Sequence, residues 1–332
     1  MTRLAIIGLG PLGASIALGL KQTKADGLYI VAAGGDKEAL SQGSKMGAVD
    51  KVANTIKDAA AEADVVMMDA TRQHTRDLLE AVGPLLKPNS VLTDTGAMKV
   101  RMMEWTKRYL PESVSYVGGH PLPKEAITHV KDARADLLAG TDYCIIQSAT
   151  AKPGAVSTVV GLAEALQARP FFLDAAEHDA FASAMSFLPV VLSSAFTTSV
   201  SSSKSWREMS KLASGEFKGI TQLASQDPEA NHLSCLASPQ TLVHWIDQMI
   251  AELYAYRKEI QENEDALLKR FIRGWEAVAR WEAGALDDEP GMPKTPTMTD
   301  SMAATFMGDL LVKKYREMTG RDRKQWEYFK KG

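Results

Sequence analysis

The stretch Arg3-Leu-Ala-Ile-Ile-Gly8-Leu-Gly10-Pro-Leu-Gly13-Ala-Ser-Ile-Ala-Leu-Gly-Leu20 decides the fold of the amino-terminal half. An apolar run typical of a β-strand leads into Gly-x-Gly-x-x-Gly, and an apolar helical pattern follows. The glycine pattern alone is a weak signal and also fits an ordinary turn, but strand before and helix after favour a dinucleotide-binding turn. The three glycines permit a tight turn, a close approach to a diphosphate, and close helix packing. The residues that we expect to bind the cofactor here are Gly8, Gly10, Pro11, Leu12 and Gly13.

A second strand-like run, residues 28–33, leads to Asp36 and Lys37. An acidic residue about twenty positions beyond the glycines can accept hydrogen bonds from both hydroxyls of an adenosine ribose. The carboxylate would repel a 2′-phosphate, so the pattern favours NAD. Lys37 could offset that repulsion, which leaves NADP open, and Asp36 could also be a plain turn residue.

Composition sets bounds on the remaining possibilities. The chain has 332 residues, of which 45% are apolar and 24% charged, which suits a soluble globular protein with two domains. The net charge of −3 gives no reason to expect nucleic acid or a membrane as partner. The two cysteines, Cys144 and Cys235, have no metal-binding spacing, so we expect buried thiols, no disulfide and no metal. No apolar run approaches the length of a membrane span, and we expect a cytoplasmic protein.

Strand-like and helical runs alternate along the first half. Further strand-like runs occupy residues 63–69, 90–94, 114–118 and 143–146, and most are separated by helical patterns at 38–46, 75–86 and 98–109. This alternation predicts a Rossmann-type α/β fold with a doubly wound, mostly parallel sheet. Ligands bind beyond the carboxyl ends of such strands. We therefore expect Ala70, Thr71 and Gly96 to contact the cofactor as well.

The second half has a different pattern. A helix at 153–167 and a strand at 170–173 close a dinucleotide-binding domain of residues 1–173. Helical periodicity over 175–203, 240–262 and 264–281 predicts an all-α substrate and dimerisation domain of residues 174–286. Residues 287–332 read as a proline-rich connector followed by a last helix. Because the long helices offer more apolar surface than a thin domain can bury, we expect a homodimer through this region.

His120 is the candidate catalytic residue. It lies in Gly118-Gly119-His120-Pro121, directly after the fifth strand-like run, where the active edge of the sheet is expected. A histidine can accept a proton near neutral pH, as the removal of a hydroxyl proton during hydride transfer requires. The alternative is a structural loop histidine. His178-Asp179, at the start of a helix, is expected to cap and orient that helix rather than to react.

Several motifs together resemble the prephenate/arogenate dehydrogenase family in order and spacing. They cover roughly residues 3–262 and comprise the glycine turn, Gly35-Asp36 with Gly47-Ala-Val-Asp50, Asp94-Thr-Gly-Ala-Met-Lys99, Gly118-Gly-His-Pro-Leu122, Glu177-His-Asp-Ala180, Ser186-Phe-Leu-Pro-Val190, and Phe217-Lys-Gly-Ile-Thr-Gln-Leu-Ala224 with Asp227-Pro228. The resemblance implies a Rossmann domain with a helical dimerisation domain, and NAD(P)-dependent hydride transfer with loss of CO₂ from a cyclohexadienyl acid in tyrosine biosynthesis. It also implies that His120 hydrogen-bonds the substrate hydroxyl and promotes its deprotonation.

The departures from the family pattern concern the substrate. Ala97 replaces a serine, Phe187 and Val190 replace two histidines, and Gln222 replaces the arginine that binds the substrate carboxylate. A neutral amide is no substitute for a bidentate guanidinium. Lys99 or Lys124 could supply a relocated cation, so the candidate substrate-binding residues are Lys99, Lys124, Ser186 and Gln222. Two alternatives to prephenate oxidation stay open: a dehydrogenase of the same architecture acting on another hydroxy acid, and a catalytically idle NAD-binding interaction protein.

Overall fold

The computed structural model describes residues 2–23, 27–69, 75–123, 125, 127–262 and 264–283. Contacts divide the chain into two compact units, Met1–Leu268 and Lys269–Gly332. The first contains the sheet and the helices as far as α12 (Pro239–Glu262). Among the expected features, Ala70, Thr71, Lys124 and the connector with the last helix at 287–332 lie outside the described residues.

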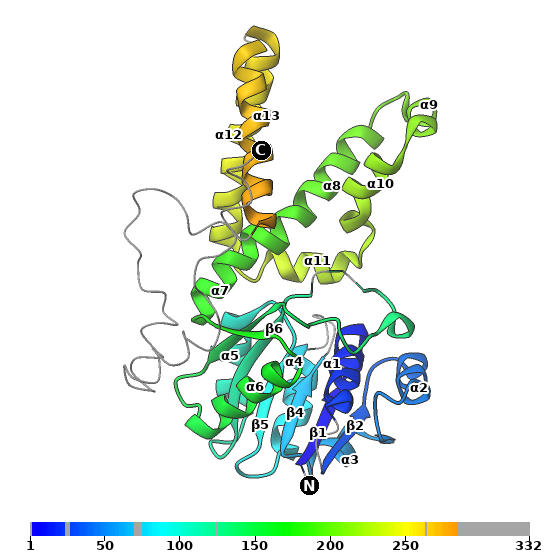
Figure 1. Cartoon of the computed structure of the whole chain (residues 1–332), viewed down its shortest axis with the longest axis vertical. Helices are drawn as coiled ribbons and strands as arrows, with labels where there is room; N and C mark the ends of the chain where they lie inside the picture. Colours follow the sequence, from blue (N-terminus) through cyan, green and yellow to red (C-terminus); the bar gives the residue numbers. More distant parts are fainter. Residues whose placement is uncertain are drawn as a thin grey trace, which may run out of the picture. The chain divides into compact units, whose positions relative to one another are not determined.

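A twisted sheet organises the first unit (Figure 1). In the described part of the chain it has eight strands in the order β3-β2-β1-β4-β5-β6-β7-β8. The strands are β1 (Thr2–Ile7), β2 (Leu28–Ala33), β3 (Lys51–Val52), β4 (Val65–Met68), β5 (Val91–Asp94), β6 (Ser115–Pro121), β7 (Asp142–Gln147) and β8 (Arg169–Phe172). All neighbouring pairs are parallel except β6 and β7. The prediction of a mostly parallel, doubly wound sheet is confirmed.

Helices cover both faces of the sheet because alternate residues of each strand point to opposite sides. Leu4 and Ile6 of β1 belong to one apolar cluster, and Ala5 and Ile7 belong to another. The first cluster includes residues of α1 (Pro11–Gln22), α2 (Lys37–Lys45) and α6 (Pro153–Ala165). The second includes residues of α3 (Ile56–Ala60), α4 (Thr75–Val82) and α5 (Lys99–Tyr109). The strands are therefore buried on both sides, as parallel sheets require.

The Gly118–Pro121 segment differs from its prediction as a loop. These residues form the second half of β6 and pair antiparallel with β7. The two glycines bring the strand close to other parts of the protein: a Cβ on Gly119 would lie 2.7 Å from the Asp94 carbonyl oxygen and 2.8 Å from the Tyr143 hydroxyl. The glycines therefore serve internal packing, and His120 is held in a strand.

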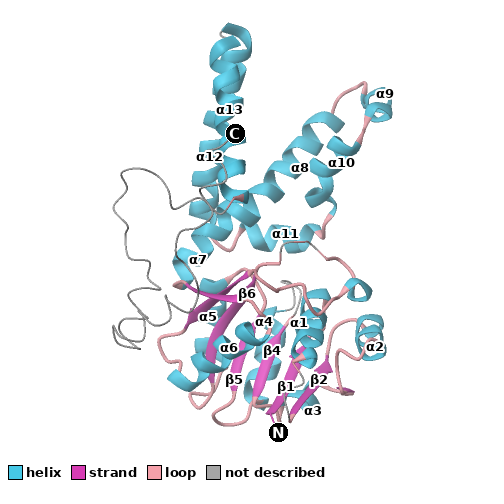
Figure 2. Cartoon of the chain, in the orientation of Figure 1, coloured by secondary structure: helices cyan, strands magenta, loops and turns pink. Residues whose placement is uncertain are grey.

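Helices alone follow β8 in the described residues (Figure 2). A continuous helix of residues 175–201 comprises α7 (Ala175–Ala182), a π-helical turn η3 (Ser183–Phe187) and α8 (Leu188–Ser201). Shorter elements come next: α9 (Trp206–Met209), η4 (Ser210–Leu212), α10 (Gly215–Thr221), η5 (Gln222–Ser225) and α11 (Pro228–Cys235). The long helices are α12 (Pro239–Glu262) and α13 (Glu264–Glu282). The predicted change from alternating elements to helices is confirmed.

The helix of residues 175–201 contradicts one expectation. It has 27 residues and an apolar window of mean hydropathy 1.6, which is enough in length and composition to cross a membrane. The prediction that no apolar run reaches this length was wrong, because the π-helical turn and Pro189 do not interrupt the helix. Core helices of soluble proteins have the same composition. Here a third of that window is buried, and the helix carries the buried polar residues His178 and Asp179.

Candidate active site

The glycine turn after β1 has the backbone geometry that its sequence predicts. Gly8 has φ +82°, a conformation that favours glycine, and its amide donates to the Ala33 carbonyl of β2. Pro11 begins α1, and Gly10 at the N-cap offers no side chain to the first amides of the helix. A helix start without a cap from its own N-cap side chain attracts anions. A phosphate-binding role for this turn stays a prediction.

Asp69, directly after β4, lies against the same turn and was missed by sequence reasoning. Its Oδ2 accepts hydrogen bonds from the amides of Gly10 at 2.7 Å and Gly13 at 2.8 Å, while its Oδ1 accepts one from the Thr95 hydroxyl at 2.7 Å. A Cβ on Gly13 would overlap this carboxylate. Burial raises the pKa of Asp69 to about 6, against the lowering effect of these hydrogen bonds. The Asp69 carboxylate therefore accepts hydrogen bonds from two of the amides that a glycine turn would offer to a bound anion.

Asp36 lies at the end of the neighbouring strand, in an exposed position. Its Oδ1 accepts a hydrogen bond from the Glu38 amide at 3.0 Å and caps α2. A Cβ on Gly35, the preceding residue, would lie 3.3 Å from the Cα of Gly8, so Asp36 stands beside the glycine turn. Lys37, the first residue of α2, is also exposed. Capping leaves Asp36 the second carboxylate oxygen for a ribose hydroxyl.

Lys99 does not have the position expected of a substrate-binding cation. Its side chain is fully buried, and Nζ lies 2.7 Å from both carboxylate oxygens of Asp94 and from the Gly119 carbonyl oxygen. Tyr116 donates a further hydrogen bond to Asp94 at 2.8 Å. With three acceptors around it, the ammonium group has used its three donors. Lys99 therefore supports the strand that carries His120, and the expectation that it contacts substrate is corrected.

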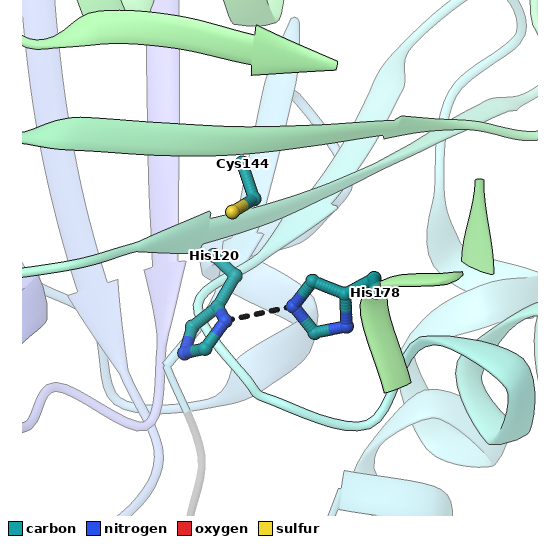
Figure 3. Close-up of side chains that lie close together, drawn as sticks. All are labelled: His120, Cys144 and His178. Atoms are coloured by element: carbon teal, nitrogen blue, oxygen red, sulfur yellow. Dashed lines mark hydrogen bonds between the residues drawn. The ribbon is translucent and has the colours of Figure 1, made fainter. Parts of the chain in front are cut away.

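His120 belongs to a chain of hydrogen bonds, of which Figure 3 shows the bond between His120 and His178. Its Nδ1 lies 2.8 Å from Nε2 of His178, and Nδ1 of His178 lies 2.9 Å from Oδ1 of Asp179. His178 and Asp179 are buried, with 3% and 1% of their surface exposed. Asp179 also accepts hydrogen bonds from the amides of Lys99 and Val100 at 2.8 and 2.9 Å. A buried carboxylate thus holds His178, and His178 holds His120.

The expectation that His178-Asp179 caps its own helix was wrong. Asp174 is the N-cap of α7, because its Oδ1 accepts the Glu177 amide at 2.8 Å. Asp179 instead binds the first amides of α5, a helix of the sheet region. This contact fastens the helical region to the sheet beside His120.

Other predicted residues are more widely spread. Gly96 lies in the loop after β5, with its amide 3.2 Å from Oδ2 of Asp94. Ser186 lies half-buried in the π-helical turn, and Gln222 is exposed at the end of α10. No hydrogen bond among the described residues connects Ser186 or Gln222 with His120. Their binding roles stay predictions.

Three of the four positions that depart from the family pattern carry buried apolar side chains, and Gln222 is the exception. Ala97 and Phe187, which replace a serine and a histidine, are 5% and 1% exposed and belong to one cluster with Ala182, Leu188 and Leu242. Val190, the second histidine position, is 8% exposed. The replacements are mutually consistent, because a polar side chain at one position would meet an apolar neighbourhood.

Comparison with known proteins places the chain. A family model described as prephenate dehydrogenase, nucleotide-binding domain, matches residues 16–171, and one described as prephenate dehydrogenase, dimerization domain, matches residues 174–273. The chain is 26% identical over 276 residues to prephenate dehydrogenase of Lactococcus lactis, covering 82% of this chain and 75% of that one. It is 26% identical over 273 residues to cyclohexadienyl dehydrogenase of Zymomonas mobilis, covering 81% and 92%.

A solved structure agrees in fold. Prephenate dehydrogenase from A. aeolicus, in complex with hydroxyphenyl propionate and NAD⁺, superposes with a TM-score of 0.75 at 20% identity and covers 85% of this chain and 98% of that chain. The two matched domain models, in this order and over most of the chain, establish the assignment. The chain is a member of the prephenate/arogenate dehydrogenase family of oxidoreductases.

Proposed function

We propose that this protein is an NAD-dependent dehydrogenase that oxidises the ring hydroxyl of prephenate or a related cyclohexadienyl acid with loss of CO₂, and that His120 is its base. The observation that carries the proposal is the chain from Asp179 through His178 to His120 at the carboxyl edge of the sheet. The named relatives, which are prephenate and cyclohexadienyl dehydrogenases, support the reaction class.

The hydrogen-bond chain determines which nitrogen of His120 is basic. An ionised Asp179 can only accept, so Nδ1 of His178 donates to it. In neutral His178 the other nitrogen, Nε2, is then an acceptor, and Nδ1 of His120 donates to it. This tautomer places the lone pair of His120 on Nε2. When Nε2 takes the hydroxyl proton of the substrate, Asp179 and His178 stabilise the positive charge that develops on His120.

The residues present fit NAD at three points. The glycine turn provides a tight backbone bend at a helix start, Asp36 provides an exposed carboxylate beside it, and the carboxyl edge of the sheet lies next to His120. NAD, when bound, accepts the hydride that leaves the substrate carbon. The protein's own part is to bind the diphosphate and ribose, to orient the hydroxyl toward Nε2 of His120 and to accept its proton.

The substrate-binding residues favour a second candidate, a dehydrogenase of the same architecture with a different hydroxy acid as substrate. Lys99 is committed to Asp94, Gln222 carries no charge, and Ala97 and Phe187 share an apolar cluster. A carboxylate held by a neutral amide instead of an arginine loses about 1.5–3 kcal/mol of charge-assisted hydrogen bonding. Prephenate binding should therefore be weaker by about one to two powers of ten.

The test measures NADH formation by its near-ultraviolet absorbance with prephenate, arogenate and a panel of other hydroxy acids. The wild type and Gln222→Arg are compared, with Gln226→Arg in the next loop as control. We expect the Gln222 variant to lower the Michaelis constant for prephenate by about tenfold or more and the control to leave it unchanged. NAD binding without turnover of any acid would contradict the proposal and favour an idle interaction protein.

We also propose that the protein is a cytoplasmic homodimer assembled through its helical region. Large apolar side chains are exposed along α12, among them Val243, Ile250, Leu253 and Ile260. Burying such a row against a second copy removes apolar surface from water. No disulfide joins Cys144 and Cys235, which suits a reducing compartment. Light scattering at micromolar concentration should give twice the chain mass, and Leu253→Asp should give the chain mass; a monomeric wild type would contradict the proposal.

A further inference from the structure

A second property of the region around His120 comes from strand register. His120 and Cys144 are directly paired residues of β6 and β7, so their side chains project from the same face of the sheet. His178 of α7 covers this pair, and Figure 3 shows the thiol beside the two hydrogen-bonded imidazole nitrogens. One donor atom from each of the three residues lies within 4.8 Å of the others. Residues 24 and 34 positions apart in the sequence are brought together by register and helix packing.

The donor set is typical of a transition-metal site. One thiol and two imidazoles suit Zn²⁺, which prefers sulfur and nitrogen ligands and tetrahedral geometry. Tetrahedral ligands stand roughly 3.3–3.8 Å apart at bond lengths of about 2.0–2.3 Å, so a small opening of the His120–His178 pair would admit the ion.

An independent observation supports the same conclusion. Metal-binding histidines usually donate their second nitrogen to a carboxylate or carbonyl, which fixes the ring and raises its basicity. Nδ1 of His178 makes this bond to Asp179 at 2.9 Å, and Asp179 is itself held by the amides of Lys99 and Val100. Nε2 of His178 is therefore oriented for a ligand with its supporting shell already in place.

We propose that His120, Cys144 and His178 form a Zn²⁺ site, and that a bound ion and the dehydrogenase reaction exclude each other. The inhibitory part of this inference rests on the proposed function of His120, whereas the binding part does not. Regulation by a metal ion would thus act on the same side chain that performs proton transfer.

A bound ion would exclude the reaction because it changes which nitrogen of His120 carries the proton. To bind the ion, Nδ1 of His120 must give up its hydrogen, and the neutral ring then carries its proton on Nε2. The nitrogen that would accept the substrate proton becomes a donor. Cys144 binds as a thiolate, so one proton leaves the thiol for solvent when Zn²⁺ enters, and no oxidant or reductant is needed.

The surroundings of the Cys144 thiol favour its protonated form in the absence of a metal ion. Burial raises the pKa of Cys144 to about 11; Asp142 on its own strand raises it further, and Lys99 of α5 opposes the rise. His120 and His178 are the other titratable groups against the thiol, with Asp179 behind them.

The test of binding uses Co²⁺ as a spectroscopic substitute for Zn²⁺, with purified full-length protein freed of metal by a chelator. Titration should give a thiolate-to-cobalt charge-transfer band in the near ultraviolet at one ion per chain. Cys144→Ser should abolish the band, and His178→Gln should weaken binding by about tenfold or more. Cys235→Ser is the matched control, because it removes the other cysteine outside this cluster. A band that survives in Cys144→Ser, or the absence of any band in the wild type, would overturn the proposal.

A second measurement tests exclusion. With an identified substrate, Zn²⁺ should inhibit turnover of the wild type and of Cys235→Ser at the concentration at which it displaces Co²⁺, and a chelator should restore activity. Cofactor binding, followed by NADH fluorescence, should be unchanged by the ion. Turnover that is unaffected while the cobalt band is present would refute exclusion and also remove His120 as base, whereas failure of the band would leave the proposed reaction intact.

Discussion

Two carboxylates lie at the carboxyl ends of the adjacent strands β4 and β5, and their hydrogen-bonding partners differ in charge. Asp94 at the end of β5 faces the buried ammonium of Lys99 and the hydroxyl of Tyr116. Among the described residues, Asp69 after β4 accepts hydrogen bonds from uncharged donors, namely the amides of Gly10 and Gly13 and the Thr95 hydroxyl. The first carboxylate is neutralised by a full opposite charge. The second is not, and burial raises its pKa to about 6.

The two carboxylates therefore have different effects: one holds its surroundings in place, and the other can change its charge. A buried ion pair with all its donors used holds its surroundings in one arrangement, and here the Lys99 ammonium reaches the Gly119 carbonyl beside His120. A carboxylate at a glycine turn, with a pKa near the physiological range, can lose its charge when another anion arrives. We infer that Asp94 and Lys99 position the histidine strand, whereas Asp69 adjusts the affinity of the turn for a diphosphate.

The largest expected effect comes from breaking the ion pair. Lys99→Met leaves Asp94 buried without a cation and should lower the free energy of unfolding by about 3–5 kcal/mol. Denaturant-induced unfolding followed by circular dichroism measures the change. Lys87→Met is the control, because Lys87 pairs with Asp64 at an exposed site and should cost less than about 1 kcal/mol. Equal losses in the two variants would show that the Asp94–Lys99 pair is not a principal support of this edge.

The next effect concerns the histidine that this pair positions. His120→Asn should lower turnover by on the order of a hundredfold or more and leave the dissociation constant for NAD nearly unchanged, because an amide is not a base at neutral pH. Steady-state kinetics and NADH fluorescence measure the two quantities. His129→Asn, at an exposed position, is the control and should have no effect. Unaltered turnover in His120→Asn would remove this residue from the mechanism.

Asp69 gives an intermediate effect with a defined pH dependence. Its folded pKa is raised from 3.8 to about 6, so the stability that it contributes is present below pH 3.8 and is lost as pH rises through about 6. Asp69→Asn keeps an acceptor for both glycine amides without the charge. It should bind NAD about tenfold more tightly at neutral pH, where the wild type is ionised, because repulsion of the diphosphate is removed.

Measurement of NAD affinity between pH 5 and 8, roughly the range around this pKa, checks the Asp69 prediction. The wild type should approach the variant as pH falls, and the affinity of Asp69→Asn should stay nearly constant. A variant with weaker affinity than the wild type at every pH would show that Asp69 supports the turn rather than opposing the cofactor.

The sequence predicted the fold more completely than the site. Alternating apolar strands, glycine turns and helical periodicity are local patterns. They were sufficient for every strand of the described sheet except the two-residue strand β3, and for the change to helices after Phe172. His120 could be selected because a strand end followed by a polar residue is also a local pattern. That His120 lies in a strand antiparallel to β7 could not be predicted, because this pairing is a tertiary contact.

The missed residues depend on contacts between distant segments. Asp69 was visible at the end of a strand, but its bond to amides 56 and 59 residues away was not. His178, Asp179 and Cys144 meet His120 only after α7 folds over the sheet. Lys99 was assigned to substrate without knowledge of its burial, and its contact with the Gly119 carbonyl oxygen, 20 positions away, could not be read from the sequence. A charge near a predicted site is informative only when its burial and partners are known.

The smallest effect is expected at Asp36, an exposed carboxylate beyond the end of β2. It extends the comparison of the Asp94 and Asp69 carboxylates to a third one. Asp36→Ala should weaken NAD binding by about two- to tenfold, the equivalent of one or two hydrogen bonds to the adenosine ribose, and should leave NADP binding unchanged or slightly stronger. Because Asp36 also caps α2 through the Glu38 amide, Asp36→Ser is the matched variant: serine keeps a cap but carries no charge. If both variants shift the ratio of NAD to NADP affinity, the carboxylate selects the cofactor. If Ala weakens both cofactors and Ser weakens neither, the capping bond accounts for the whole effect, and the preference for NAD has another origin.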